Sequence, residues 1–108
     1  MNDDQYDDLS VPTTCPYTLT RVRAHVTHDG GLAFDATLTL DGVPFATVVQ
    51  DGRGGADLLR PVRTGDRQRI DEYRAYARTV LEPQGVIYES EDALTSELLE
   101  HWAAGGDQ

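Results

Sequence analysis

The sequence predicts a single α+β domain, built as a three-stranded antiparallel meander with two C-terminal helices packed on one face of the sheet. Three observations predict this class. The chain has 108 residues, the size of one domain with a modest core. Apolar residues alternate with a period of two in the first half of the chain and recur at helical spacing in the second half. Glycine-containing turns separate the alternating runs.

We place the domain at residues 17–102. Residues 1–16 are acidic and then rich in proline and threonine, which predicts a flexible arm. Residues 103–108 are expected to form a frayed tail.

Each of the three predicted strands presents its core-facing positions on one side. In chain order these positions are Val22, Ala24 and Val26, then Leu32, Phe34, Ala36, Leu38 and Leu40, then Val43, Phe45, Thr47 and Val49. The strands are joined by turns at Asp29-Gly30-Gly31 and Asp41-Gly42, and the second of these suits a two-residue type I′ turn. The sheet therefore has one apolar face that the rest of the chain must cover.

Apolar residues spaced three and four apart predict the two helices. The first begins near Thr64 or Asp66, either of which can act as N-cap, and its pattern stops at Pro83. Its buried positions are Ile70, Tyr73, Tyr76, Ala77, Val80 and Leu81. The second helix opens with Ser90 as its capping residue. Its buried stripe is Leu94, Leu98, Leu99 and Trp102.

The apolar triplet Val86, Ile87 and Tyr88 lies between the two predicted helices. It has two interpretations, a fourth edge strand of the sheet or an extended connector.

The chain is strongly acidic, with a net charge of −10 and a pI near 4.4. Such a protein is repelled by nucleic acid and by anionic membranes. The acidity serves either solubility or a surface that docks on a basic protein as a mimic of nucleic acid. With one cysteine, no signal-peptide pattern and no apolar stretch of the ~20 residues that span a bilayer, the chain is expected to be soluble and cytoplasmic.

The candidate acidic face lies on the second helix and just before it. Its members are Glu89, Glu91, Asp92, Glu97, Glu100 and Trp102. One interpretation is an amphipathic helix packed on the sheet with a solvated polar face. The other is a surface that meets a basic groove on a partner, with Trp102 as an anchor because tryptophan is enriched among interface hot spots.

The second candidate site is the glycine-rich loop after the third strand. It comprises Asp51, Gly52, Arg53, Gly54 and Gly55, with Arg60 nearby. The run lacks the Gly-Lys-Ser/Thr ending of a P-loop and the spacing of a dinucleotide fingerprint. It is either a structural exit that permits close backbone packing against a helix, or a loop that presents N–H groups and Arg53 to an anion or a partner.

Catalytic and metal-binding signals are weak. No serine or cysteine occupies a nucleophile motif, so the chain is predicted not to be an enzyme. His25 and His28 are three apart, which on a strand directs them to opposite faces, so no metal site is predicted. No cofactor motif is found either.

Three neighbouring stretches form one recognisable pattern: the strand Phe34-Asp35-Ala36-Thr37-Leu38, the turn Leu40-Asp41-Gly42 and the segment from Val48 to Gly55. In this pattern the chain resembles a group of small uncharacterised proteins from bacteria and their phages. Members of that group carry an x-Asp-Gly hairpin followed by an Asn-Asp-Gly-x-Gly-Gly segment, where this chain has Gln50 in place of Asn. The resemblance implies an accessory role in a phage or mobile element and no particular activity.

The first functional hypothesis is therefore a non-enzymatic acidic interaction protein that modulates a host or defence protein with a basic surface. The alternative is a small ligand- or nucleic-acid-binding module that uses loop 51–55 and nearby arginines. An open sheet edge on the first or third strand would also allow a homodimer by edge pairing.

Overall fold

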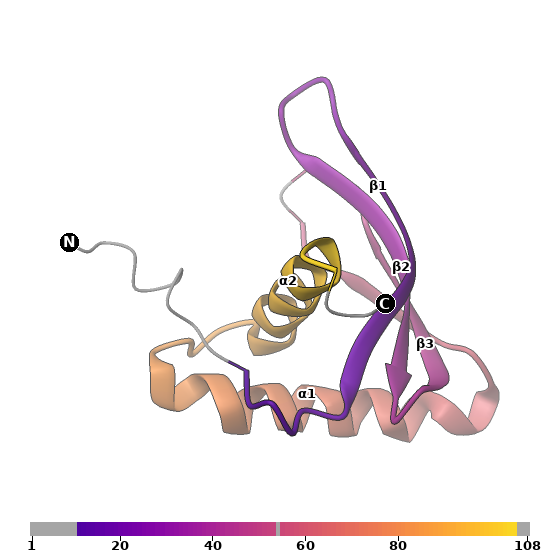
Figure 1. Cartoon of the computed structure of the whole chain (residues 1–108), viewed down its shortest axis with the longest axis vertical. Helices are drawn as coiled ribbons and strands as arrows, with labels where there is room; N and C mark the ends of the chain where they lie inside the picture. Colours follow the sequence, from indigo (N-terminus) through magenta and orange to yellow (C-terminus); the bar gives the residue numbers. More distant parts are fainter. Residues whose placement is uncertain (1–10, 54, 106–108) are drawn as a thin grey trace.

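The computed structural model describes residues 11–53 and 55–105. Within them, four strands form one antiparallel sheet in the order β1-β2-β3-β4. The strands are β1 (Tyr17–Val26), β2 (Leu32–Leu40), β3 (Val43–Gln50) and β4 (Leu58–Pro61). The 3-10 turn η1 (Thr64–Asp66), helix α1 (Arg67–Leu81), the 3-10 turn η2 (Glu82–Gln84) and helix α2 (Ser90–Ala103) follow. The α+β class, the antiparallel meander and the two C-terminal helices are confirmed (Figure 1).

The fourth strand comes from a segment that the sequence pattern did not mark. β4 pairs with β3 through Thr47 opposite Arg60 and Val48 opposite Leu59. Residues 86–88 form the extended connector between η2 and α2, so the second interpretation of that triplet is the correct one.

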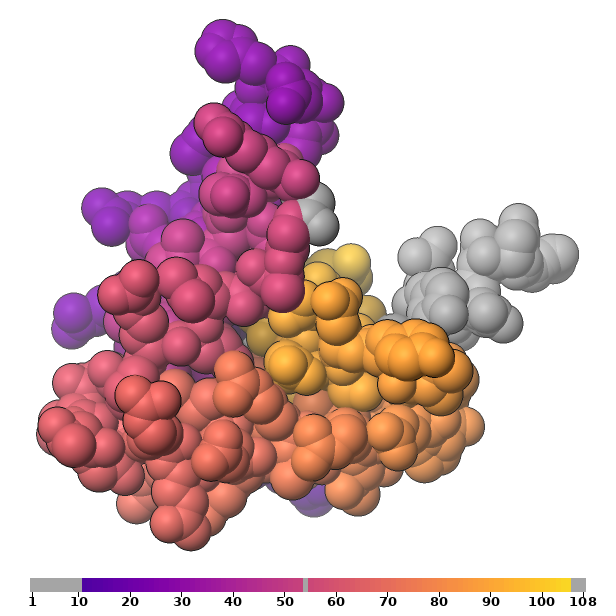
Figure 2. Space-filling model, turned by 180° about the vertical axis from the view of Figure 1, so that it is seen from behind, coloured from indigo at the N-terminus to yellow at the C-terminus, as the bar shows by residue number. Residues whose placement is uncertain are grey.

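The helices cover one face of the sheet, but the end of the β1–β2 hairpin extends beyond them and is not covered (Figure 1). In Figure 1, α1 runs beneath the strands and α2 packs beside β1. The hairpin of β1 and β2 rises beyond both helices, and its tip projects from the body of the molecule in Figure 2. The uncovered hairpin end explains why Val26 and Leu32, expected on the core side, are 71% and 46% exposed.

A β-bulge changes which residues of β3 face the core. Leu38 pairs with Ala46, but the next residue of β2, Thr39, pairs with Pro44. Phe45 is thus the extra residue on β3, and both it and Ala46 are buried.

The expectation that Thr47 and Val49 face the core is therefore wrong. Beyond the bulge the alternation is shifted by one residue, so Val48 points inward and is fully buried. Val49 is 41% exposed on the opposite face, and Val43, at the start of the strand, is also exposed. A one-residue shift exchanges the two faces of a strand because side chains alternate with a period of two.

A second irregularity lies in β1, where the register shifts between Thr20 and Arg23. Arg21, inside this shift, has a φ of +54°, which is uncommon for a residue with a side chain. The bulge bends the outer edge strand of the sheet.

The predicted helix faces form the core. Ile70, Tyr73, Ala77 and Leu81 of α1 are buried, and Tyr76 and Val80 are half-buried. Tyr73 packs edge-on against Tyr17 with ring centroids 4.9 Å apart. On α2, Leu94 and Leu98 are buried, whereas Leu99 and Trp102 are half-buried.

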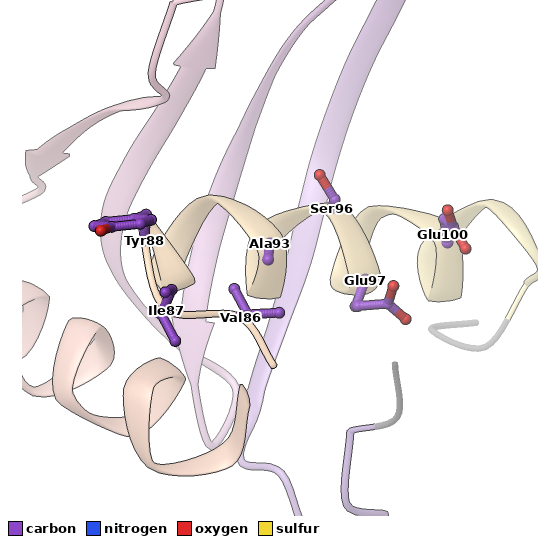
Figure 3. Close-up of a pocket in the computed structure, with 7 residues that line it drawn as sticks. All are labelled: Val86, Ile87, Tyr88, Ala93, Ser96, Glu97 and Glu100. Carbon is purple, nitrogen blue, oxygen red and sulfur yellow. The ribbon is translucent and has the colours of Figure 1, made fainter. Parts of the chain in front are cut away.

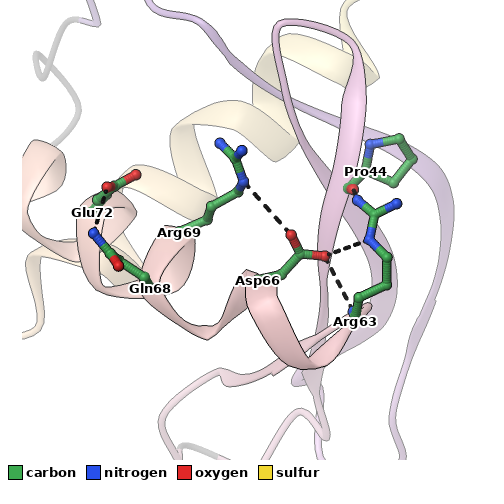
Figure 4. Close-up of polar contacts among 6 residues, drawn as sticks. All are labelled: Pro44, Arg63, Asp66, Gln68, Arg69 and Glu72. Carbon is green, nitrogen blue, oxygen red and sulfur yellow. Dashed lines mark hydrogen bonds and ion pairs between the residues drawn. The ribbon is translucent and has the colours of Figure 1, made fainter.

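A buried aspartate sets the start of α1, as the sequence predicted for this region. Asp66 is 5% exposed, and its Oδ2 accepts hydrogen bonds from the backbone N–H and the Nε of Arg63, both at 3.1 Å. Arg69 Nε lies 3.6 Å from its Oδ1 (Figure 4). Arg63 also donates to the Pro44 carbonyl at 3.3 Å, which ties the helix start to β3.

The start of α2 differs from expectation, because Ser90 is not the capping residue. The cap position is Glu89, and the buried Ser90 hydroxyl donates to the Val86 carbonyl at 3.4 Å instead. Ser90 therefore ties the first turn of α2 to the connector that precedes it.

At the N-terminal side, residues 11–16 of the proposed arm lie against the domain. Val11 and Cys15 pack on the core, and the Asp41 N–H donates to the Pro16 carbonyl at 2.9 Å. Residues 1–10 and 106–108 of the arm and tail lie outside the described residues. Within the described part, no helix has the length and apolar character needed to cross a membrane.

Candidate interaction surfaces

The glycine loop after β3 is held by hydrogen bonds to its own chain. The Gly52 N–H donates to Gln50 Oε1, and the Arg53 N–H donates to Asp51 Oδ1, each at 2.9 Å. The Gln50 amide in turn donates to the Gly55 carbonyl at 2.9 Å. Two of the N–H groups that could cradle an anion therefore already have acceptors.

The glycines allow this loop to sit against the turn between β1 and β2. Gly52 has a φ of +80°, and a Cβ on Gly31 would lie 2.0 Å from its carbonyl oxygen. A Cβ on Gly52 would lie 2.8 Å from the methyl carbon of Thr27. Gly55 would tolerate a Cβ without contact, and Gly54 lies outside the described residues. The geometry favours the structural interpretation of Gly52, with the hairpin rather than a helix as its packing partner.

Arg53 and Asp51 border a small hollow next to the same hairpin turn. The hollow has a volume of about 470 Å³ and is also lined by His25, Val26, Thr27, His28 and Asp29. His25 and His28 thus reach one hollow, contrary to the expectation of opposite faces, because the strand ends at Val26 and alternation no longer applies. Among the described residues, no group of three or more His, Cys, Asp and Glu is placed to hold a metal ion.

Arg60 lies elsewhere, on the uncovered face of the sheet. It stands on β4 opposite Thr47, which stands opposite Thr37 of β2. Arg53 lies by the hairpin turn instead, so the two arginines do not form one basic site.

The predicted acidic residues of α2 spread around the helix. Glu91 faces α1, where its Oε2 lies 3.5 Å from Arg74 Nε. Asp92 faces the start of β4 and accepts the Asp57 N–H at 3.3 Å. Trp102 is half-buried rather than exposed.

Asp57 and Asp92 form a carboxylate pair with altered acidity. Partial burial raises the pKa of Asp57, although its hydrogen bond from the Gln50 amide opposes this. Burial first, and then the nearby charge of Asp57, raises the pKa of Asp92 to about 6. Asp92 therefore titrates closer to neutrality than an ordinary aspartate.

The remaining side of α2 borders a hollow of about 380 Å³ (Figure 3). Its lining residues are Val86, Ile87, Tyr88, Ala93, Ser96, Glu97 and Glu100. In Figure 3 the connector residues Ile87 and Tyr88 stand at one end, and Glu97 and Glu100 stand further along α2. Ile87 is 65% exposed and Tyr88 is 81% exposed.

The backbone around residues 86–88 holds these two apolar side chains outward. Val86 is buried, and its N–H donates to the Leu81 carbonyl at 3.1 Å. Gly85 before the segment has a φ of +100°, and Glu89 after it has a φ of +52°. A non-glycine residue in the left-handed region is costly and persists where its surroundings enforce it. The sequence showed the apolar triplet but gave no sign that two of its members would be exposed.

Another hollow, of about 430 Å³, lies at the far end of α2 and brings together Cys15 and His101. The Cys15 thiol donates a hydrogen bond to the Tyr17 carbonyl oxygen, which lies 3.8 Å from its sulfur. The sequence separates these residues by most of the chain, so no pattern could have paired them.

Comparison with known proteins gives no match, whether to a family model, a curated protein or a solved structure.

Proposed function

We propose that this chain is a non-enzymatic interaction protein that binds a protein with a basic surface. The observation that carries the proposal is the hollow beside α2, where Ile87 and Tyr88 are exposed next to Glu97 and Glu100. Exposed apolar groups rimmed by charge are typical of protein-binding sites, and aromatic residues are over-represented among their energetic anchors.

The charge of this region supports a cationic partner. Residues 82–105 contain six acidic residues and neither lysine nor arginine. Two of the acids, Glu91 and Asp92, are engaged within the fold by Arg74 and Asp57. The excess of acidic over basic residues gives this region a negative potential, which speeds association with a basic surface.

A nucleic-acid ligand is less favoured. The net charge of −10 opposes it, and the uncovered sheet face offers no aromatic ring within the described residues on which bases could stack. The three aromatic residues of the sheet, Tyr17, Phe34 and Phe45, are all buried in the core.

The setting of this interaction is part of the proposal. The segment from Phe34 to Gly55 resembles small proteins of bacteria and their phages. This resemblance supports an accessory role in a mobile element, in which the chain would act in the cytoplasm on a host or defence protein. A partner that normally binds nucleic acid would make the acidic surface a competitor for that site.

The edge strands of the sheet, β1 and β4, have features that disfavour dimerisation by edge pairing. Edge strands that avoid pairing are short, bulged, charged or interrupted by proline. β4 has four residues and ends at Pro61, and β1 carries a bulge at Arg21 with Arg23 beside it. We therefore propose that the chain binds its partner as a monomer.

Affinity capture tests the function. The tagged chain is incubated with a lysate of its native host, with and without nuclease, and bound proteins are identified by mass spectrometry. We expect one dominant basic protein that survives nuclease and is released by salt. Glu97→Gln/Glu100→Gln should lose it, whereas the matched charge change Asp29→Asn/Asp41→Asn at two exposed turns should retain it. Equal capture by both variants, or a partner that disappears with nuclease, would count against the proposal.

A further inference from the structure

We infer that the hollow beside α2 binds a basic amphipathic helix of the partner, a refinement that rests on the proposed function. The occupant would place apolar side chains against Ile87 and Tyr88 and cationic side chains against Glu97 and Glu100. Three features of the hollow point to a helix: the groups it offers, the spacing of those groups and the smallness of the residues between them.

The hollow offers side chains rather than backbone partners. Four of its seven lining residues, from Ala93 to Glu100, belong to α2. The N–H and C=O groups of a helix interior are already bonded within the helix. An extended peptide laid here would leave its own buried N–H and C=O groups without partners, whereas a helix satisfies them internally.

The spacing of the lining groups matches a helix. Ala93, Ser96 or Glu97, and Glu100 stand at positions i, i+3 or i+4, and i+7 of α2, so they share one side of it. At 1.5 Å per residue, the stretch from Ala93 to Glu100 is about 10 Å long, or two helical turns. A partner helix with an apolar residue at one position and an arginine or lysine two turns later would match the apolar and acidic ends.

The small side chains between the two ends allow close approach. Ala93 and Ser96 line the hollow, and in Figure 3 they stand along α2 between the connector residues and Glu100. Helices pack at 8–10 Å between axes, and the distance depends on the side chains at the contact. Larger residues at these two positions would hold a partner helix away from Val86 and Ile87.

The display of Ile87 and Tyr88 is already in place before binding. Val86 is anchored by the Leu81 carbonyl and by the Ser90 hydroxyl, at 3.1 and 3.4 Å. Because the connector is fixed on both sides, little ordering cost remains for a partner to meet, and preorganisation of this kind strengthens binding.

Titration with designed peptides tests the inference. The probe is a synthetic peptide of about 18 residues, roughly five turns, with leucines at three- and four-residue spacing flanked by arginines. A second peptide of the same composition and charge has its leucines and arginines reordered and a central proline, so that it cannot form the amphipathic helix. Binding to the isotope-labelled full chain is followed by amide chemical shifts at low and high salt.

We expect the helical peptide to bind at least about tenfold more tightly than the proline peptide, with shifts centred on residues 86–100. Ile87→Ser/Tyr88→Ser should weaken it by about tenfold or more, as hot-spot residues do. The matched control Val26→Ser/Leu32→Ser, which removes two exposed apolar side chains at the hairpin tip, should bind like the unaltered chain.

The outcomes separate this inference from the proposed function. Salt-sensitive binding of both peptides with equal affinity would overturn the helix inference and leave the acidic-surface function standing. Binding of neither peptide at low salt would count against both. Shifts centred on the hairpin or on the bare sheet face would overturn the location in the hollow.

Discussion

Removing one partner of the buried hydrogen bond between Tyr73 and Thr95 should destabilise the fold, and the two single substitutions should differ in size. The two hydroxyl oxygens are 2.7 Å apart, and neither residue is more than 1% exposed. Thr95 Oγ1 also donates to the Glu91 carbonyl at 2.8 Å. Since a hydroxyl has one hydrogen, Tyr73 must be the donor and Thr95 the acceptor in their shared bond.

This assignment sets the magnitudes. Thr95→Val preserves the shape but leaves the Tyr73 hydroxyl buried without an acceptor, which costs about 1–3 kcal/mol. Tyr73→Phe removes the donor and leaves Thr95 still bonded to Glu91, so only about 0.5–1.5 kcal/mol is lost. Burial also raises the pKa of Tyr73, so its hydroxyl stays protonated and remains a donor throughout the neutral range.

Urea denaturation followed by circular dichroism of the two single variants and the double variant measures these costs. We expect Thr95→Val to cost more than Tyr73→Phe, and the double variant to cost less than the sum because the residues are in contact. In a domain of this size each kcal/mol also lowers Tm by roughly 4 °C or more. A Tyr73→Phe variant as unstable as Thr95→Val, or strictly additive effects, would refute the donor assignment.

Three further predictions concern the packing, the core and the acidity of the domain. Gly31→Ala should lower the folding stability by about 1–3 kcal/mol, because its Cβ would lie 2.0 Å from the Gly52 carbonyl oxygen. The control Gly55→Ala should change stability little, and thermal melting of both variants compares them. Leu38→Asp places a charge at a fully buried position and should abolish cooperative unfolding, and an intact transition would contradict the core assignment. Since the pKa of Asp92 rises from 3.8 to about 6 on folding, its charged form is disfavoured in the folded state; Asp92→Asn should therefore gain stability relative to the unaltered chain as the pH rises from about 4 to 7. Solvent screening limits this gain to about 1 kcal/mol or less. If the denaturation midpoints of the variant and of the unaltered chain changed by the same amount between these two pH values, the result would contradict the prediction.

The sequence was sufficient for the elements whose periodic signal is long. β2 and both helices have several regularly spaced apolar residues, and the Asp41-Gly42 turn has positive φ at both residues, as a type I′ turn requires. β4 was missed because four residues carry too little alternation to stand out from a loop. It exists because β3 offers a free edge on which Leu59 can lie beside Val48.

The bulges mark the limit of pattern reasoning within a strand. The period-two pattern of Val43, Phe45, Thr47 and Val49 is regular in the sequence, but the extra residue at Phe45 exchanges the faces beyond it. What decides the phase is pairing with β2, which places Val48 beside the buried Ala36. Such pairing is a property of two segments together and is not encoded in either one alone.

For the candidate sites, the sequence could identify acidic residues near α2 but not which of them the fold uses internally. Glu91 is held by Arg74, and Asp92 lies against Asp57, because these flanks of α2 face α1 and β4. In the same way, the glycines of loop 51–55 predicted a close backbone approach without saying that Gly31 would be the other side of it.

The availability of the remaining side of α2 follows from how the rest of the helix is used. Leu94 and Leu98 are buried in the core, and the two flanks contact neighbouring elements through Glu91 and Asp92. A single helix that buries its apolar stripe would ordinarily present only polar residues on its opposite side. Here the connector adds Ile87 and Tyr88 to that side, so the exposed apolar surface comes from outside the helical pattern. An amphipathic helix needs no such addition to fold, and this is why we propose that Ile87 and Tyr88 serve binding rather than stability.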